Sequence, residues 1–325
     1  MKAVLCKEFG PPSRLVLEEV PSLKPGSKEV VVNVKACGIN FPDTLIIQGL
    51  YQIRPGLPFT PGSDIAGIVK EVGAGVSHVK KGDAVFGFVA YGGLAEEVIV
   101  PSNACFLKPK QMGFPVAASF MMAYGTSYHA LKDRAKLKEG ETLLVLGAAG
   151  GVGLAAVELG KLMGAKVIAS ASTDEKLALC REYGADDTIN YSKTDLKATI
   201  KELTGGKGAD VIYDPVGGEF SEKAFRGIGW NGRFLVVGFA AGVIPKLPLN
   251  LPLLKGASIV GVFWGGFAQG NPKANMENTK TLMKWHQEGK IKPHIHKIHE
   301  LEDTSKALEE MMERKVRGKL VVQIK

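Results

Sequence analysis

The sequence predicts an α/β protein in which a domain of alternating strands and helices is inserted into a β-rich domain. Residues 1–118 contain short β-rich runs separated by Gly and Pro, whereas residues 140–261 alternate apolar, strand-like runs with helical segments. Residues 318–325 read as one more strand, and an isolated strand at a chain end needs a partner. We therefore expect the chain to end in its first domain.

The β-rich part holds five runs of strand-forming residues bounded by turn-forming residues. This pattern predicts a twisted, partly open β-barrel. The five runs are 15–20, 29–38, 64–76, 83–88 and 94–100.

The next part of the chain repeats a strand and a helix, and ends on two more strands. Repeated units of this kind predict a doubly wound parallel sheet with helices on both faces. The predicted strands are 142–147, 166–170, 187–190, 209–214, 233–239 and 258–262, and the predicted helices are 151–163, 174–183, 194–203 and 219–225.

Beyond residue 262 the pattern predicts a helix over 275–287, a strand over 295–301 and an amphipathic helix over 301–315. A chain of 325 residues suits two domains of ordinary size. We expect residues 1–120 and 262–325 to form the β-rich domain and residues 121–261 the α/β domain.

The composition is that of an ordinary globular protein, with 45% hydrophobic and 23% charged residues, which excludes disordered, collagen-like and disulfide-rich classes. A formal net charge of +8 favours anionic ligands without demanding nucleic acid. The four cysteines form no CxxC pair, which indicates a reducing compartment. No signal peptide and no membrane-spanning run are visible, so we expect a cytoplasmic protein without a membrane partner.

A glycine-rich loop, GAAGGVG over 147–153, follows the first strand of the α/β domain and leads into a helix. From Ala148 it reads AxGxxG, one letter from the dinucleotide fingerprint, in which small residues let the backbone approach a diphosphate at a helix N-terminus. Because strand, loop, helix and second strand come in the required order, a dinucleotide site is favoured over a turn without a ligand. The residues expected to bind it are Ala148, Ala149, Gly150, Gly151 and Val152.

The tip of the second strand indicates which nicotinamide cofactor is preferred. An acidic residue there binds the ribose hydroxyls of NAD and repels the 2′-phosphate of NADP. This tip carries Ser170 and Ser172 instead, whereas Asp174 and Glu175 read as first-turn residues of the next helix. Hydroxyls with Lys176 nearby suit a phosphate, so NADPH is expected; the alternative for Lys176 is a solvated helix residue.

Further motifs along nearly the whole chain are specific in order and spacing. They are ACGINFPDTLIIQGLY (36–51), LPFTPGSDIAGIVKEVGAGV (57–76), KKGDAVFG (80–87), AYGTSYHAL (123–131), INYS (189–192), YDPVGG (213–218) and GFAAG (238–242), together with GAAGGVG. By these motifs the chain resembles the medium-chain dehydrogenase/reductase superfamily, and within it the zinc-independent quinone oxidoreductase group related to zeta-crystallin. The resemblance implies a Rossmann domain inserted in a GroES-like β-barrel domain, and usually a homodimer.

The sequence departs from the zinc alcohol dehydrogenases, the other large branch of that superfamily. Asn40 stands where that branch has a cysteine ligand, and residues 62–64 read GSD where it has GHE. Of four closely spaced cysteines needed for a second zinc, only Cys105 lies nearby. We therefore expect no metal.

His294, His296 and His299 form the remaining metal-like cluster. In an extended segment His294 and His296 share a face, and His299 does not. Surface histidines are therefore expected rather than a metal site.

Without a metal ion, the acceptor must itself delocalise developing negative charge, which suits quinones and α,β-unsaturated carbonyls. By resemblance Asn40 faces the nicotinamide and the substrate, where its amide donates to the acceptor oxygen or caps the following loop. Tyr51 donates a hydrogen bond or a proton to the reduced product, or packs as an aromatic. Asp43, with Asp64, is expected to organise this catalytic wall through backbone hydrogen bonds.

The resemblance implies further cofactor contacts. Thr126 is expected near the nicotinamide ribose or phosphate, and Tyr191 against the adenosine 2′-phosphate. Three aromatic residues follow the fifth and sixth strands at the carboxyl edge, where they shape an acceptor pocket or pack the interior. They are Phe239, Phe263 and Trp264, and the remaining expected cofactor contacts are Asn40, Val216 and Arg317.

Three functions stay open at this point. The first is an NADPH-dependent reductase of quinones, acting by hydride transfer to a conjugated carbonyl. The second is an alkenal or enone double-bond reductase, which the same pocket would serve. The third is a non-catalytic NADPH-binding protein, crystallin-like or weakly RNA-binding, although nucleic acid is not expected as a partner.

Overall fold

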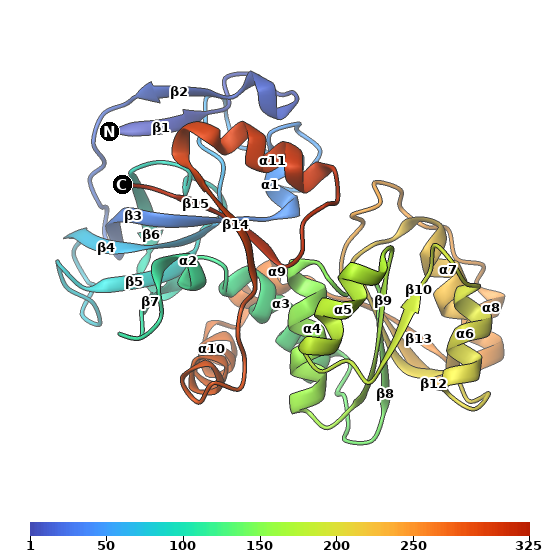
Figure 1. The fold of residues 1–325 in the computed structure, drawn as a ribbon. Coiled ribbons are helices and arrows are strands. Elements are labelled where there is room, and N and C mark those ends of the chain that lie inside the picture. The colour runs from blue at the N-terminus through green and yellow to red at the C-terminus, as the bar shows by residue number, and fades with distance from the viewer. The chain divides into compact units, whose positions relative to one another are not determined.

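The computed structural model describes residues 1–325 and divides into two compact units. Unit 1 comprises residues 1–122 and 293–325, and unit 2 comprises residues 123–292. Figure 1 shows the course of the chain through both. No helix is long and apolar enough to cross a membrane.

Unit 1 is built on a seven-stranded sheet in the order β14-β15-β3-β4-β5-β7, with β6 also paired to β3. A separate antiparallel pair is formed by β1 and β2. The strands are β1 (Lys2–Leu5), β2 (Val16–Glu19), β3 (Glu29–Ile39), β4 (Asp64–Val72), β5 (Ala84–Phe88), β6 (Glu97–Pro101), β7 (Cys105–Leu107), β14 (Ile295–Glu300) and β15 (Lys319–Gln323).

The C-terminal strand β15 runs antiparallel to β3, with Leu320 opposite Ile39 and Val322 opposite Cys37. In Figure 1 the red end of the chain therefore lies against its blue beginning. The predicted return of the chain to its first domain is confirmed. The helices of this unit are α1 (Phe41–Ile46), α2 (Phe114–Ala117) and α11 (Thr304–Met312).

Strand β3 is the centre of the unit 1 core. Its residues Val30, Val31 and Val32 are all fully buried. Three consecutive apolar residues can be buried only where both faces of a strand are covered, which is why this strand lacks a period-two pattern. The N-terminal half of β3 pairs with β6, and its C-terminal end is held in a fixed register between β4 and β15.

Unit 2 contains a six-stranded sheet in the order β10-β9-β8-β11-β12-β13, and every pair in it is parallel. The predicted doubly wound parallel sheet is confirmed. Its strands are β8 (Thr142–Val145), β9 (Lys166–Ala171), β10 (Asp187–Asn190), β11 (Ala209–Asp214), β12 (Ile228–Val236) and β13 (Ser258–Gly261). Its helices are α3 (Thr126–Tyr128), α4 (Gly151–Leu162), α5 (Asp174–Glu182), α6 (Leu196–Leu203), α7 (Gly218–Arg226), α8 (Asn250–Lys255), α9 (Trp264–Gly270) and α10 (Pro272–Gln287).

The segment 262–292 clusters with unit 2 and not with the β-rich unit to which the sequence pattern assigned it. Helix α10 is attached to the start of unit 2 by polar contacts, and Phe267 of α9 stacks on the His129 ring there. Asn278 of α10 donates to Asp133 at 2.9 Å and accepts from Lys132 at 2.5 Å. The chain therefore leaves the parallel sheet at residue 262 but leaves the unit only after Lys292.

Candidate functional site

The glycine-rich loop lies between β8 and α4, at the carboxyl edge of the parallel sheet. The Ala148 N–H donates to the Ser170 carbonyl oxygen at 3.0 Å, which ties the loop to the end of β9. A Cβ at Gly153 would lie 2.3 Å from the Gly147 carbonyl oxygen, so the helix packs against the loop as only glycine allows. Helix α4 begins at Gly151, and first-turn N–H groups have no acceptor within their helix. These donors are available to an anion at the sheet edge.

Ser170, at the end of β9, carries a buried hydroxyl without a hydrogen-bond partner. Leaving such a hydroxyl unpaired costs about 1–3 kcal/mol of folding free energy. A bound ligand that hydrogen-bonds to it would remove that cost. The close-packed loop, the helix N-terminus and this hydroxyl lie at one edge of one sheet. Together they fit the diphosphate and ribose of a dinucleotide.

The acidic residue after β9, Asp174, is bound by neighbouring side chains. As predicted, Asp174 is the first residue of α5, and the Thr173 side chain caps the helix by accepting the Lys176 N–H at 3.3 Å. The Asp174 carboxylate accepts from Asn190 Nδ2 at 2.6 Å and lies 2.5 Å from Lys193 Nζ. Its charge is therefore offset within the protein, and the hydroxyl-bearing residues Ser170 and Ser172 flank Ala171 at the end of β9.

The other cofactor residues expected in unit 2 differ in exposure. Val216 lies beside the loop, since its Cγ2 is 2.7 Å from the position of a Cβ on Gly147. The Tyr191 ring is 4.4 Å from that of Phe220, centroid to centroid. Thr126 is buried and Phe263 is exposed. Half-buried are Gly150, Gly151 and Val152, which follow Ala149, and also Ser172, Lys176 and Phe239.

Trp264 packs inside unit 2. Its side chain is buried, its indole N–H donates to Asn275 Oδ1 at 3.1 Å, and its ring fills the space beside Gly125. A Cβ on Gly125 would lie 2.8 Å from the ring. The contacts therefore support the packing alternative for Trp264 over a pocket lining.

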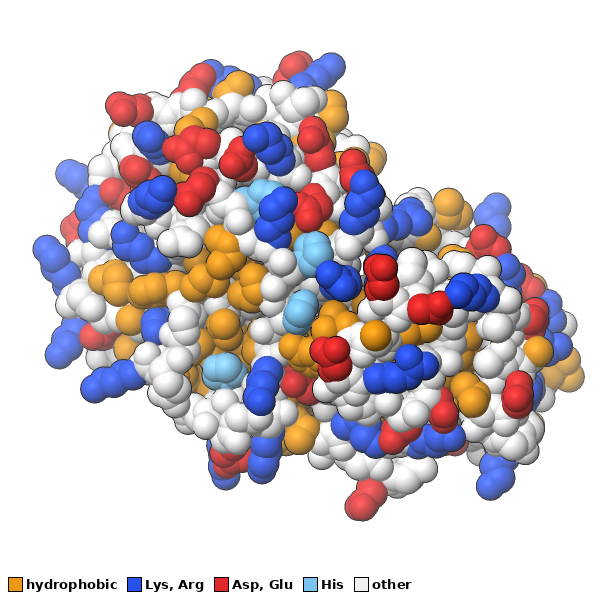
Figure 2. All heavy atoms as spheres, in the orientation of Figure 1, with side chains coloured by type: hydrophobic (Ala, Val, Ile, Leu, Met, Phe, Trp, Pro, Cys, Tyr) orange, Lys and Arg blue, Asp and Glu red, His pale blue; other side chains and the backbone are white.

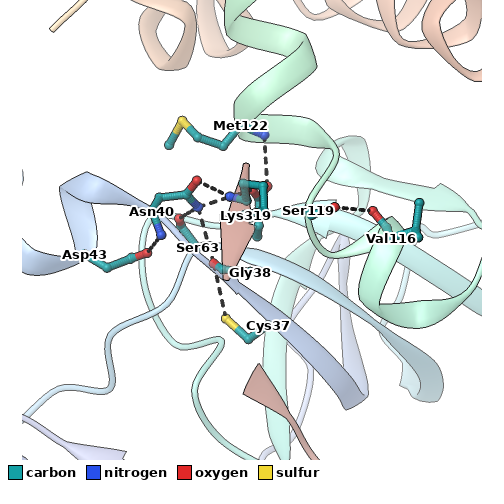
Figure 3. A network of polar contacts seen from close by, with 10 residues as sticks. Cys37, Gly38, Asn40, Asp43, Ser63, Val116, Ser119, Met122 and Lys319 are labelled. Atoms are coloured by element: carbon teal, nitrogen blue, oxygen red, sulfur yellow. Dashed lines mark hydrogen bonds and ion pairs between the residues drawn. The ribbon is translucent and has the colours of Figure 1, made fainter. Parts of the chain in front are cut away.

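A polar cluster in unit 1 surrounds Asn40, which directly follows β3 (Figure 3). Asn40 Nδ2 is 3.2 Å from Asp64 Oδ2, 3.4 Å from Ser63 Oγ and 3.3 Å from the Gly38 carbonyl oxygen. Asn40 Oδ1 accepts from the ammonium of Lys319, which also lies 3.4 Å from Asp64 Oδ2. We name these residues, Asn40, Ser63, Asp64 and Lys319, the buried polar cluster.

The amide of Asn40 is engaged on both sides within this cluster. Its oxygen accepts from Lys319, and its nitrogen has three protein acceptors for two hydrogens. These contacts give the Asn40 side chain a structural role within the cluster, which differs from the capping of the following loop that the sequence offered as the alternative. A direct role in contact with substrate or cofactor stays a prediction.

Asp43 and Tyr51 lie next to the cluster. Asp43 Oδ2 accepts the Asn40 backbone N–H at 2.7 Å, so this carboxyl holds the start of α1, as the backbone role expected for it requires. Tyr51 is half-buried and packs against the core of unit 1. Burial raises the pKa of the Tyr51 phenol, and the charge of Asp43 raises it further.

We expect the Asp43→Asn variant to lose part of the pH dependence of folding stability. Burial raises the pKa of Asp43 from 3.8 to about 7, although the Asn40 N–H and the Lys319 charge act against it. The folded state then holds a proton that the unfolded chain releases between about pH 4 and 7. This carboxyl therefore contributes stability fully below about pH 4, and the contribution is lost as the pH rises through 7.

Urea unfolding at several pH values between 4 and 8 measures this effect. The free energy of unfolding of the wild type should fall more steeply with rising pH than that of Asp43→Asn. Asp303→Asn is the control, because Asp303 has a pKa lowered by its contact with Lys306, the opposite direction. Equal slopes for the wild type and Asp43→Asn would contradict the prediction.

Lys319 is the functional candidate that sequence reasoning missed. Arg317, the expected cofactor contact nearby, is exposed and stays a prediction, whereas Lys319 is the one buried lysine of the chain. The strand pairing could have identified Lys319, because a final strand paired with the end of β3 places its first residue beside Asn40.

The donor set around Asn40 does not fit a zinc ion. The two oxygen atoms that face this position, Asn40 Oδ1 and Asp64 Oδ2, already bind the Lys319 ammonium. No group of three or more His, Cys, Asp or Glu side chains is arranged to hold a metal ion.

The three histidines are placed differently from the expectation. His296 and His299 both face Glu310, with Nε2 to carboxylate distances of 3.4 Å and 3.1 Å, and His299 is buried. The register of β14 against β15 is irregular between Ile295 and Lys297, so simple alternation fails at His296.

Comparisons with known proteins match both units. The alcohol dehydrogenase GroES-like domain matches residues 26–110, and the zinc-binding dehydrogenase domain matches residues 151–283. Quinone oxidoreductase-like protein 2 of Bos taurus is 42% identical over 325 residues, which cover 100% of this chain and 93% of that relative.

Two solved structures are informative. Escherichia coli quinone oxidoreductase complexed with NADPH superposes with a TM-score of 0.94 at 30% identity, covering 99% of this chain and 100% of that one. CurK enoyl reductase has a TM-score of 0.91 at 28% identity, covering 100% of this chain and 99% of that one. The α/β fold with a GroES-like domain and a Rossmann-like sheet is thus the one predicted.

Proposed function

Because the chain belongs to the medium-chain dehydrogenase/reductase family, among the quinone oxidoreductase-like proteins, we propose that it is an NADPH-dependent reductase of quinones. The observation that carries the proposal is the dinucleotide cradle of unit 2. It joins the close-packed loop and the N-terminus of α4 to the unpaired Ser170 hydroxyl. The solved quinone oxidoreductase with this fold was crystallised with NADPH.

The preference for NADPH over NADH is supported by the end of β9. Ser172 and Lys176 offer a hydroxyl and a charge to a 2′-phosphate, and Tyr191 follows the neighbouring strand β10. Asp174, which would repel that phosphate, is paired with Lys193. These side chains would hold the adenosine end, and the α4 N-terminus would hold the diphosphate.

The reduced nicotinamide, when bound, supplies the hydride. The chain's own residues bind and orient the cofactor and exclude water around the reacting carbons. The oxygen atoms of Asn40 and Asp64 that face this position bind the Lys319 ammonium, and we propose an acceptor that delocalises negative charge by itself. A quinone meets that requirement because both of its carbonyl groups are conjugated with the reacting ring.

Cofactor preference is tested by fluorescence titration of the full-length protein with NADPH and with NADH. We expect NADPH to bind at least about tenfold more tightly, as a charge-assisted contact to a phosphate provides. Lys176→Met should weaken NADPH binding and leave NADH binding unchanged, whereas Lys273→Met, at an exposed lysine of α10, should change neither. Tighter binding of NADH would contradict the proposed preference.

The acceptor is tested by adding menadione or methyl vinyl ketone to the NADPH complex. Oxidation of NADPH by menadione supports the quinone reductase. Oxidation by methyl vinyl ketone alone supports the second candidate, an alkenal or enone double-bond reductase, which the likeness to CurK enoyl reductase favours. Tight NADPH binding without oxidation by either compound would support the non-catalytic binding protein.

A role in RNA binding receives no support from the surface in view. Figure 2 shows positive and negative side chains interspersed there, without the extended basic stripe that nucleic acids bind.

The four cysteines are free and buried, which agrees with a reducing, cytoplasmic location.

We also propose that the chain forms a homodimer through unit 2. Strand β13 is an edge of the parallel sheet, and nothing pairs with its outer side. Large apolar side chains are exposed on β13 and on the adjoining α8 and β12, and they are Ile259, Leu253, Leu254 and Trp230. A second copy offers the same open strand, so two-fold pairing would cover both edges at once.

We expect Ile259→Lys to shift the protein from dimer to monomer in light scattering at micromolar concentration. Lysine on an edge strand opposes strand pairing and places two like charges near the two-fold axis. Leu107→Lys, at an exposed apolar residue of β7, is the matched control and should stay dimeric. A wild type that is monomeric, or an unchanged mass for Ile259→Lys, would contradict this interface.

A further inference from the structure

Lys319 reaches the buried polar cluster because three strand ends meet there. It is the first residue of β15, and the pairing of Leu320 with Ile39 places it beside Asn40. Asp64 is the first residue of β4, and it lies opposite Gly38 of β3. The meeting of these three side chains is therefore set by the backbone register of the central sheet, not by flexible loops.

The cluster forms a closed ring of polar contacts. The Lys319 ammonium binds Asn40 Oδ1 and lies 3.4 Å from Asp64 Oδ2, and the same carboxylate oxygen is 3.2 Å from Asn40 Nδ2. The other carboxylate oxygen accepts the Met122 N–H at 3.0 Å. Figure 3 shows Asn40, Ser63 and Lys319 converging, with Met122 arriving from a separate segment.

This ring decides how the Asn40 amide is oriented. An ammonium has only donors, so it can face the amide oxygen but not the amide nitrogen. With Lys319 in place, Oδ1 is fixed toward β15 and Nδ2 toward Ser63 and Asp64. Without the ammonium, the nearly symmetric amide would be free to turn over or to adopt another rotamer.

The ring also sets the charge of the site. Two carboxyl groups, Asp43 and Asp64, are buried here with Lys319 as the single buried cation. The Lys319 charge opposes the rise in pKa that burial causes at both. A buried ion pair contributes little to stability compared with apolar residues of the same volume, so a role in the site is the more direct reason for its presence.

We propose that Lys319 is a positioning residue, whose buried ammonium holds the Asn40 amide and the Asp64 carboxylate in the arrangement that hydride transfer requires. The inference rests on the proposed function. It places a buried cation beside the Asn40 amide and the Asp64 carboxylate of unit 1. It acts through Asn40 and Asp64, which it contacts directly.

Stopped-flow measurement of NADPH oxidation by menadione in a single turnover tests the functional part. Lys319→Met should slow hydride transfer at least about tenfold, the loss of roughly one hydrogen bond to a charged group, with the dissociation constant of NADPH changed less than about twofold. Lys2→Met removes an exposed lysine of the same unit and should leave the rate unchanged. Lys319→Arg keeps the charge and should regain part of the rate.

The double variant Asp64→Asn/Lys319→Met separates positioning from folding. It removes both charges, so it should fold as a neutral pair even where Lys319→Met does not. If Lys319 positions Asn40, the double variant stays slow. A wild-type rate in either variant would overturn the inference, because the ion pair would then serve folding alone.

A readout without turnover tests the geometric part. In protein labelled with nitrogen-15, the side-chain amide signal of Asn40 is identified by its loss in Asn40→Asp. Its hydrogens should exchange slowly in the wild type and at least about tenfold faster in Lys319→Met, since a fixed amide is protected. Unchanged exchange would overturn the inference. Changed exchange in a protein that oxidises NADPH with neither acceptor would overturn the proposed function instead.

Discussion

Replacing Lys319 with methionine is expected to lower the free energy of unfolding at neutral pH by about 3–5 kcal/mol, the usual cost of breaking a buried ion pair. The variant leaves the Asp64 carboxylate buried with no cation beside it, and leaves Asn40 Oδ1 without its donor. The side chains of Lys319 and Asp64 are 5% and 1% exposed, so water cannot replace the lost ammonium.

Adding Asp64→Asn to Lys319→Met should restore most of the lost stability. A neutral amide in place of the carboxylate removes the unpaired charge, and apolar replacement of a buried pair is often neutral or stabilising. Urea unfolding of both variants and of Lys2→Met measures the effect. The Lys2–Glu302 pair is exposed, so Lys2→Met should change stability little. A loss for Lys319→Met as small as that for Lys2→Met would contradict the prediction.

The architecture of unit 2 could be predicted because its determinants are local in sequence. The loop from Gly147 to Gly153 contains the glycine that the helix contact needs, and α4 begins at Gly151 as expected. Asp174 could be assigned to the first turn of α5 because acidic residues suit a helix N-terminus. Neither inference depended on distant residues.

The buried polar cluster could be predicted only in part, because it depends on pairing between distant strands. Asn40 was singled out by the family resemblance, because it stands where the zinc branch has a cysteine ligand, but its partner Lys319 is 279 residues away. The register of β15 against β3 places Lys319 beside Asn40, and only a shift of two residues, which keeps the same face of the strand, would bring Arg317 there instead.

The domain boundary after β13 was not visible for a related reason. Residues 264–287 are helical, and their sequence does not tell which unit their polar side chains contact. The indole of Trp264 bonds to Asn275, and Asn278 bonds to Asp133, so tertiary contacts of single side chains keep these helices in unit 2. Helix α9 itself, rich in glycine, gave no helical signal in the sequence.

Gly153→Val is expected to abolish tight NADPH binding. A Cβ at this position would lie 2.3 Å from the Gly147 carbonyl oxygen and 2.9 Å from Ala148 Cα, and both atoms belong to the backbone. Neither can move aside as a side chain would, so the helix must withdraw from the loop. A displacement of about 1 Å would take the first-turn N–H groups out of hydrogen-bond range of the diphosphate.

We expect the dissociation constant of NADPH to rise more than about a hundredfold in Gly153→Val, and stability to fall by about 1–3 kcal/mol through overpacking. Gly153→Ala should show the same loss of binding in smaller measure, because the clash already begins at Cβ. Gly270→Ala is the matched control, since a Cβ there meets nothing within 4 Å. Fluorescence titration measures binding, and circular dichroism shows whether unit 2 is still folded. Wild-type affinity in a folded Gly153→Val protein would mean that the cofactor does not bind at the α4 N-terminus, and the proposed function would lose the observation that carries it.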